Sequence, residues 1–316
     1  NLAHRMQMVS SMWNIIRKNQ AIYESARRFG MLPLTPPWLT KIQPGHVFHI
    51  IHDDTSQEND KDLNWYQWRC IESILRHHPT ARLFVYSNTI EQSLFDVLTE
   101  VGYQVILRNY ELSELIKQTP LMEFFDNLDR KLSAEITLEK TMHENGVLRL
   151  LLLYKYGGIY LSENTIVLKN IDISQSNVFS LDSESYVNPW MLNFEKNHKF
   201  LRDALEMFPK MYNAKMRPDE GKALLTKLWN KWQSNAGSKD SIEIAKKNKF
   251  YNLVDVSQAQ YEKQIKMIKS EVDVIRIPDA SKCLENGKDH DTPQIKQATI
   301  CKDIFNEQCL FCSNQY

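Results

Sequence analysis

The stretch "YKYGGIYLSENTIVLKNID", residues 154–172, contains the features that decide the fold. Two adjacent glycines, Gly157 and Gly158, follow a run of apolar and aromatic residues and precede a second apolar segment. Glycine after such a run is typical of a helix C-terminus, because the residue there needs a positive φ angle. We therefore predict a nearly all-apolar helix over residues 145–158, followed by a strand over residues 159–161.

The sequence before this stretch alternates between short apolar runs and amphipathic runs. The apolar runs, which we predict as strands, cover residues 46–52, 81–88 and 103–109, and the predicted helices cover residues 65–79 and 90–102. Strands that alternate with helices at this spacing favour βαβ units. The sequence therefore predicts an α/β fold with a mostly parallel sheet flanked by helices. Further along, residues 221–232 form an amphipathic helical pattern and residues 273–278 a late strand pattern.

The chain of 316 residues divides into three predicted parts. Residues 1–45 hold six Lys and Arg against one acid, Glu24, and we predict a basic N-terminal arm, with a mitochondrial targeting remnant as the alternative. Residues 46–280 form the α/β domain. Residues 281–316 form a tail with four cysteines, for which disulfides, free thiols and zinc all stay open. These are Cys283, Cys301, Cys309 and Cys312.

Charge and hydropathy narrow the partners that we expect. The formal net charge is zero, which gives no reason to expect nucleic acid. No apolar run approaches the roughly 20 residues that span a bilayer, so we expect membrane association through partner proteins. The absence of any Asn-x-Ser/Thr sequon leans against a secretory route.

Several segments resemble, in order, the alpha-1,4-galactosyltransferase family of globotriaosylceramide synthase-like enzymes. They are "CIESILRHHPTARLFVYS" (70–87), "LIKQTP" (115–120), the block 149–161, "NFEKNHKFL" (193–201) and "FYNLVDVSQAQYEK" (250–263). The resemblance covers most of residues 46–262. It implies a GT-A type fold, a Rossmann-like α/β domain that binds a nucleotide sugar.

The resembled family places Asp-x-Asp after the strand, where one carboxylate contacts the donor and another holds a divalent cation. Here the three residues are Ser162, Glu163 and Asn164. A hydroxyl and a neutral amide are weak ligands for a hard cation. Glu163 occupies the middle position, whose side chain points to the other face of an extended chain. We interpret Glu163 as a solvated acid, and a replacement of the lost pair by Glu163 requires a local twist.

Other working positions of the family also differ. The sequence has Asn145-Gly146, Glu220-Gly221-Lys222 and Arg276-Ile277-Pro278 in place of the family's Ser-Asp, Asn-Gly-Pro and His-x-Trp. Some transferases of this fold neutralise the diphosphate with cationic side chains, and Lys155, Lys222 and Arg276 are candidates for that role.

Individual residues allow a functional and a structural interpretation. Arg149 either reaches a phosphate or, as we favour, pairs with a nearby acid or carbonyl. For His198 we favour a surface residue at a helix entry over a catalytic base. Asp53 and Asp54 either contact uridine or, as we favour, are ordinary loop residues. Cys70, on the apolar face of its helix, fits a buried free thiol.

The sequence therefore retains the apolar framework of the family and lacks several of its polar groups. We expect a glycosyltransferase-like protein that has lost catalysis and serves as an accessory subunit of a larger assembly, with a mitochondrial membrane complex favoured. No cofactor or metal is expected. The vestigial donor site consists of Arg149, Ser162, Glu163, Asn164 and His198.

Two alternatives remain open. The first is an active, retaining hexosyltransferase of the Golgi lumen that uses a UDP-sugar and Mn²⁺ on a glycan or glycolipid acceptor. The second is a sugar- or nucleotide-binding module without turnover.

Overall fold

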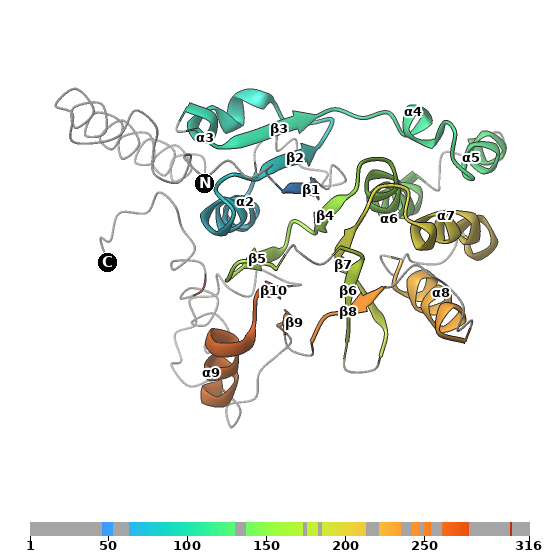
Figure 1. Cartoon of the computed structure of the whole chain (residues 1–316). Coiled ribbons are helices and arrows are strands. Elements are labelled where there is room, and N and C mark those ends of the chain that lie inside the picture. The colour runs from blue at the N-terminus through green and yellow to red at the C-terminus, as the bar shows by residue number, and fades with distance from the viewer. Residues whose placement is uncertain are drawn as a thin grey trace.

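The computed structural model shows an α/β protein built on a twisted central sheet (Figure 1). It describes residues 46–52, 63–100, 102–129, 137–172, 176–182, 185–212, 221–234, 242–246, 249–253, 261–277 and 304. The predicted basic arm and, apart from residue 304, the predicted cysteine-bearing tail lie outside these residues.

The described strands are β1 (Val47–Ile51), β2 (Arg82–Tyr86), β3 (Gln104–Arg108), β4 (Gly158–Leu161), β5 (Thr165–Val167), β6 (Val178–Leu181), β7 (Val187–Phe194), β8 (Glu243–Ile244), β9 (Phe250–Asn252) and β10 (Val274–Arg276). The described helices are α2 (Trp65–His77), η1 (Gln92–Phe95), α3 (Asp96–Glu100), α4 (Leu112–Ile116), α5 (Met122–Asp129), α6 (Thr137–Tyr156), α7 (Lys199–Met211), α8 (Lys222–Ser234) and α9 (Tyr261–Glu271).

The central sheet has seven strands in the order β3-β2-β1-β4-β7-β6-β8. Four of its six pairings are parallel, and the antiparallel ones join β7 to β4 and to β6. The predicted fold class, a mostly parallel sheet flanked by helices, is confirmed. Because β1, β2, β3 and β4 run in the same direction, the residues that follow them meet at one edge of the sheet.

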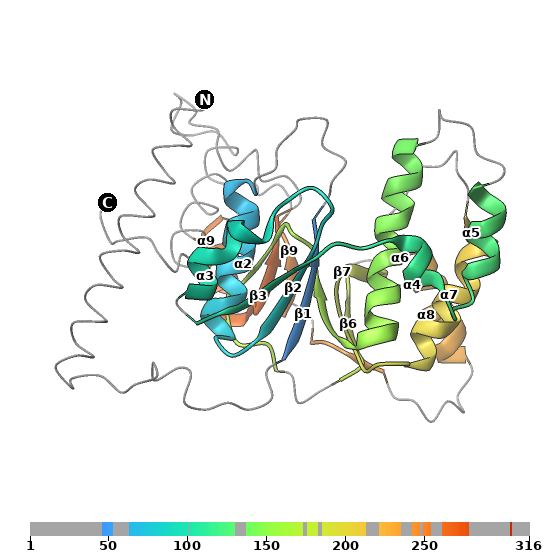
Figure 2. The same cartoon turned by 90° about the horizontal axis from the view of Figure 1, so that it is seen from above.

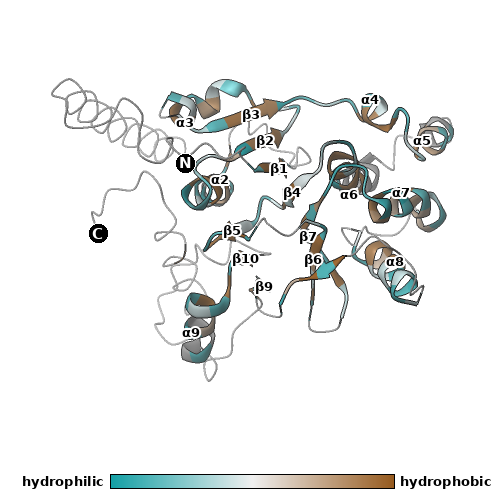
Figure 3. Cartoon of the chain, viewed as in Figure 1, coloured by the Kyte–Doolittle hydropathy of each residue, from teal (hydrophilic) through white to brown (hydrophobic). Residues whose placement is uncertain are grey.

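The sheet is the middle of three layers. Figure 2 shows α2 and α3 on one side and α4, α6, α7 and α8 on the other. Side chains alternate along β1, so that Phe48 and Ile50 pack in the cluster under α2, whereas Ile51 joins the cluster under α6. The brown segments in Figure 3 follow these strands, and teal lies along the outer surfaces of α7 and α8.

A second sheet of three strands, in the order β5-β10-β9, lies next to the end of β4. Strand β10 is antiparallel to β5, with Arg276 opposite Thr165. This pairing brings a late part of the sequence beside the polar triplet that follows β4.

The helix before β4 is longer than the sequence predicts. Helix α6 begins at Thr137 rather than at residue 145, so Asn145 and Gly146 lie inside it. The apolar pattern marks only the buried part of the helix, from Val147 to Leu153. The polar segment before it continues the helix, because it is rich in residues such as Leu, Glu, Lys and Met that favour helices.

The two glycines at the junction of α6 and β4 adopt the positive φ angles that the sequence predicts. The angles are 67° at Gly157 and 103° at Gly158. The carbonyl of Gly157 lies 2.8 Å from Nε2 of His49 on β1, whose Nδ1 is 3.1 Å from the Tyr86 hydroxyl. Burial lowers the pKa of His49 to about 4, so the ring is neutral near pH 7 and donates one hydrogen bond while accepting the other. A Cβ atom at Gly158 would lie 2.6 Å from the Val47 carbonyl oxygen.

We expect Gly158→Ala to destabilise the protein by about 3 kcal/mol, from backbone strain and the clash with β1. Gly146→Ala is the matched control, because a Cβ there meets no atom within 4 Å. Alanine inside a helix should raise stability by about 0.5–1 kcal/mol. Urea unfolding of both variants measures the difference. Equal effects would show that the approach of β4 to β1 does not depend on Gly158.

Candidate functional site

Strands β1 and β4 end side by side, and the polar residues that follow them meet at the carboxyl edge of the sheet. The register pairs His49 with Tyr160. Continued for three residues, it sets His52 beside Glu163. Open α/β sheets bind ligands at this edge, so these residues mark the candidate site.

The first turn of α2 contributes a third side chain to this edge. Asn64 caps the helix by accepting a hydrogen bond from the Gln67 amide at 3.0 Å, and Gln67 Oε1 accepts from the Asn64 amide at 2.8 Å. This capping box fixes the orientation of the Gln67 side chain. Its Nε2 therefore points away from the cap and donates to Glu163 Oε2 at 2.7 Å.

The carboxylate of Glu163 is bound on the α2 side of the sheet. His52 Nδ1 lies 3.0 Å from the oxygen that Gln67 also contacts, and the Glu163 side chain is 21% exposed. The prediction that Glu163 is simply a solvated acid is wrong. The side chain points to the opposite face from Ser162 and Asn164, as predicted, and that face is the α2 side, where buried His52 and Gln67 contact and cover it.

Asn164 contacts a different neighbour, strand β10 and the residue after it, and Ser162 is bonded to Asn164. Ser162 Oγ donates to Asn164 Oδ1 at 2.6 Å, and the Asn164 carbonyl accepts from the Ile277 amide at 2.9 Å. Arg276 Nε lies 3.4 Å from the same Asn164 Oδ1. The turn is tightened by Thr165, whose Oγ1 donates to the Ser162 carbonyl at 2.6 Å.

The described residues of this site do not fit a divalent cation. Mn²⁺ and Mg²⁺ favour carboxylate oxygens, but the oxygens of Ser162 and Asn164 are neutral and bonded to each other. The guanidinium of Arg276 lies next to the Asn164 oxygen and repels a second cation there. No group of three or more His, Cys, Asp or Glu arranged for a metal is found among the described residues. Asp53 and Asp54 lie outside those residues.

Arg149 lies on α6 and packs against β4 and β7. It is buried, its Nη1 donates to the Pro189 carbonyl at 2.9 Å, and its guanidinium lies 5.0 Å from the centre of the Tyr160 ring. The favoured structural interpretation, a bond to a carbonyl, is confirmed.

His198 and Lys155 lie near the opposite end of β4. His198 caps α7 by accepting from the Phe200 amide at 3.2 Å, just after β7 ends at Phe194, the partner of Gly158. It is a helix-entry residue as predicted, but it is buried rather than exposed. Lys155, at the end of α6, donates to the Lys117 carbonyl at 3.2 Å. The structure does not bring either residue together with the triplet.

Three cationic residues, Lys155, Lys222 and Arg276, are candidates for a role at the triplet. Within the described part of the chain, Arg276 is the one that contacts it, through Asn164. Lys222 forms an ion pair of 2.7 Å with Asp182 and lies over the Tyr186 ring. Its charge is therefore already balanced by an acid. Glu220 and Pro278 lie outside the described residues.

Cys70 is the buried free thiol that the sequence predicts. Its Sγ donates to the Ser162 carbonyl at 3.7 Å. Burial raises the pKa of the thiol to about 12, so it stays protonated near neutral pH and is a poor nucleophile. The four tail cysteines lie outside the described residues.

Sequence reasoning missed His52 and Gln67. A signal for Gln67 was present, because Asn64 and Gln67 have the spacing of a capping box. The position of His52 beside Glu163 follows from the register between β1 and β4, and the sequence alone does not give that register.

Residues 66–180 match the family model described as "Glycosyltransferase sugar-binding region containing DXD motif". Within those residues the sequence contains no Asp-x-Asp. The lactosylceramide 4-alpha-galactosyltransferase of Mus musculus is 28% identical over 203 residues, which are 60% of this chain and 52% of that protein. The Homo sapiens alpha-1,4-N-acetylglucosaminyltransferase is 26% identical over 129 residues, 40% of this chain and 36% of that protein.

These similarities confirm the resemblance predicted from the sequence: the matched region is glycosyltransferase-like. The chain spans about half the length of the lactosylceramide 4-alpha-galactosyltransferases that it matches. Solved structures with similarity include the PaToxG glycosyltransferase, with a TM-score of 0.44 and 14% identity over 72% of this chain and 81% of that chain. Mouse xyloside xylosyltransferase 1 has a TM-score of 0.40 and 9% identity over 74% and 97%.

We expect Glu163→Ala to destabilise the fold by about 1–3 kcal/mol, because it leaves buried His52 and Gln67 without their shared acceptor. The matched control is Glu114→Ala, which removes an exposed carboxylate paired with Lys117. An exposed pair contributes less than about 1 kcal/mol. Chemical denaturation of the two variants tests this, and an effect of Glu163→Ala no larger than that of the control would contradict the covered position of Glu163.

Proposed function

We propose that this chain is a hexosyltransferase that takes its sugar from a nucleoside-diphosphate donor, with a UDP-sugar as the donor class. The observation that carries the proposal is the match of residues 66–180 to a glycosyltransferase sugar-binding region. The relatives named above are transferases of galactose and of N-acetylglucosamine by their names. They favour turnover over the loss of catalysis that the triplet alone suggests.

The position of the polar residues supports the proposal. The turn 162–165 lies at the carboxyl edge of β4, where the fold class places ligands. On one side of it lies the cluster of His52, Gln67 and Glu163, and on the other lies Arg276. A donor that lies across this turn meets hydrogen-bonding groups from both sides.

Transfer breaks the bond between the anomeric carbon and the diphosphate oxygen, and a bond forms between that carbon and an acceptor oxygen. The acceptor loses its proton, which ends on the departing diphosphate or in solvent. Negative charge grows on the diphosphate as it leaves, so the site must stabilise an anion. Under this proposal the Arg276 guanidinium supplies that positive charge, and an arginine fork suits phosphate geometry.

The second candidate is a protein without turnover, and one observation favours it. The side-chain oxygens of Ser162 and Asn164, at the two ends of the triplet, are neutral and hydrogen-bonded to each other, so these two positions supply no pair of carboxylates. A role as an accessory subunit, in a mitochondrial complex or elsewhere, belongs to this candidate. The transferase proposal goes instead with the Golgi lumen and a glycan or glycolipid acceptor.

Release of UDP from UDP-galactose, UDP-glucose and UDP-N-acetylglucosamine tests the proposal, with a lactose-based acceptor. We expect release above background that persists in EDTA. Arg276→Gln should lower kcat/KM by about a hundredfold, the usual effect of removing one group that stabilises developing charge. Arg82→Gln, at an exposed position in β2, is the matched control and should leave kcat/KM unchanged.

Two other outcomes count against the proposal. No UDP release and no UDP binding by calorimetry, with all three donors, would favour the protein without turnover. Release that EDTA abolishes and that Arg276→Gln leaves unchanged would keep the transferase but remove the role of Arg276.

A further inference from the structure

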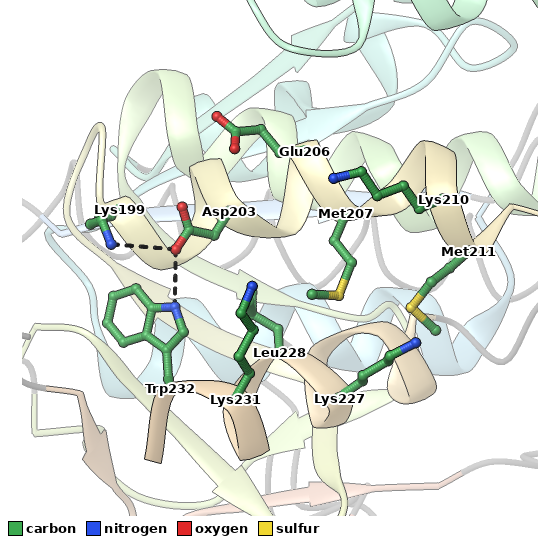
Figure 4. A pocket seen from close by; sticks show the side chains of 10 residues that line it. All are labelled: Lys199, Asp203, Glu206, Met207, Lys210, Met211, Lys227, Leu228, Lys231 and Trp232. Carbon is green, nitrogen blue, oxygen red and sulfur yellow. Dashed lines mark hydrogen bonds and ion pairs between the residues drawn. The ribbon is translucent and has the colours of Figure 1, made fainter. Parts of the chain in front are cut away.

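A cavity of about 490 Å³ lies between α7 and α8, two helices on the same face of the sheet (Figures 1 and 4). The inner faces of both helices are used by the core, with Leu201 and Leu205 on α7 and Leu224 and Leu225 on α8 buried in it. The cavity therefore opens on the outer face. Its volume is in the range of about 300–1,000 Å³ that is typical of sites for single small ligands.

One end of the cavity is closed by a set of satisfied contacts. Asp203 Oδ2 accepts from Trp232 Nε1 at 3.0 Å and pairs with Lys199 at 3.6 Å, as Figure 4 shows. The Lys199 ammonium also lies 5.2 Å from the centre of the Trp232 ring. This end joins the start of α7 to the end of α8 and leaves no group for a ligand to neutralise.

The other end of the cavity has an excess of positive charge. Lys210 on α7 and Lys227 on α8 line it, and Lys231 lies nearer to Trp232 (Figure 4). None of these three lysines forms an ion pair within the described part of the chain. The remaining acid of the lining, Glu206, is engaged by Arg202 at 3.1 Å. Lys227 and Lys231 are four residues apart on one helix, a spacing at which like charges repel. An anion bound between the helices would relieve this repulsion.

Between the lysines the surface is apolar and adaptable. Met207 and Met211 point from α7 toward α8, where they face Leu228 (Figure 4). Both methionines are half-buried. Unbranched thioether side chains adjust to the shape of a bound hydrocarbon. The cavity thus combines three ammonium groups with an apolar floor.

We propose that the α7–α8 cavity binds the headgroup of an anionic phospholipid presented by a membrane. The phosphate lies among Lys210, Lys227 and Lys231, and the upper acyl chain lies against Met207 and Met211. A phospholipid offers both a phosphate for the lysines and a hydrocarbon chain for the methionines, whereas an acidic peptide matches only the charge. The proposal does not depend on turnover at the β4 edge. It gives the chain a direct membrane contact where the sequence predicts only an indirect one, although no helix in the described residues is long and apolar enough to cross a bilayer.

The test measures binding of the full chain to vesicles of phosphatidylcholine alone and of phosphatidylcholine with phosphatidylserine. The variant changes Lys210, Lys227 and Lys231 together to Gln. A lysine near an anionic membrane surface contributes about fivefold in affinity, so the triple variant should bind about a hundredfold more weakly. The matched control changes Lys263, Lys266 and Lys269 to Gln on α9, which lies at the far side of the molecule in Figure 1. The basic segment before residue 46 is common to all variants and contributes equally to each.

A second measurement separates a built site from simple attraction to the surface. Soluble dihexanoyl-phosphatidylserine should bind the wild-type chain in calorimetry, and Met207→Gln with Met211→Gln should weaken it without a change of charge. Inorganic phosphate and a poly-glutamate peptide should bind more weakly than the short-chain lipid. Equal losses in the α7–α8 and α9 triple variants, or tighter binding of poly-glutamate than of the lipid, would overturn the proposal.

Discussion

The close approach of β4 to β1 is the constraint on which the candidate site depends. At Gly158 the strands are so near that a Cβ atom would lie 2.6 Å from the Val47 carbonyl oxygen. The hydrogen bond between the His49 side chain on β1 and the Gly157 carbonyl, just before β4, joins the two strands at the same place. The resulting register sets His52 beside Glu163. These two residues lie five positions beyond Val47 and Gly158, about 16 Å further along, since each residue of a strand advances about 3.3 Å. The absence of a side chain at Gly158, at one end of the strands, therefore helps to set the register that brings His52 and Glu163 together at the other end.

The sequence predicts the framework well because the framework rests on local patterns. Apolar runs of strand length, a glycine pair after a helix and a capping residue each follow from nearby residues, and β1, α2, β4 and α8 appear close to where they are expected. The site is harder to predict, because its contacts join residues about a hundred positions apart. Glu163 illustrates this limit: alternation gives the face on which it lies, but only the fold shows that His52 and Gln67 occupy that face.

On the side of Ser162 and Asn164, the turn after β4 has a cationic side chain, Arg276, where a site that holds a metal has carboxylates. A carboxylate pair attracts a divalent cation, and the cation then binds the diphosphate. Here a side chain, Arg276, supplies the positive charge. Its Nε lies 3.4 Å from the neutral Oδ1 of Asn164. Carboxylates in place of Ser162 and Asn164 would form ion pairs with that guanidinium and weaken its attraction for a phosphate. Neutral Ser162 and Asn164 are therefore compatible with the role that the proposed function gives to Arg276.

The cluster of His52, Gln67 and Glu163 bears on whether this edge is still used. Buried polar groups contribute little or no net stability compared with apolar side chains of the same size, and a carboxylate is costly to desolvate. A chain that needs only its framework gains nothing from an ionisable group here, and apolar residues would pack as well against α2. The cluster leaves Glu163 one-fifth exposed at the edge where ligands of α/β proteins bind. Under the proposed function, the cluster orients a ligand at this edge, a role that would account for an ionisable group which the stability of the fold does not require.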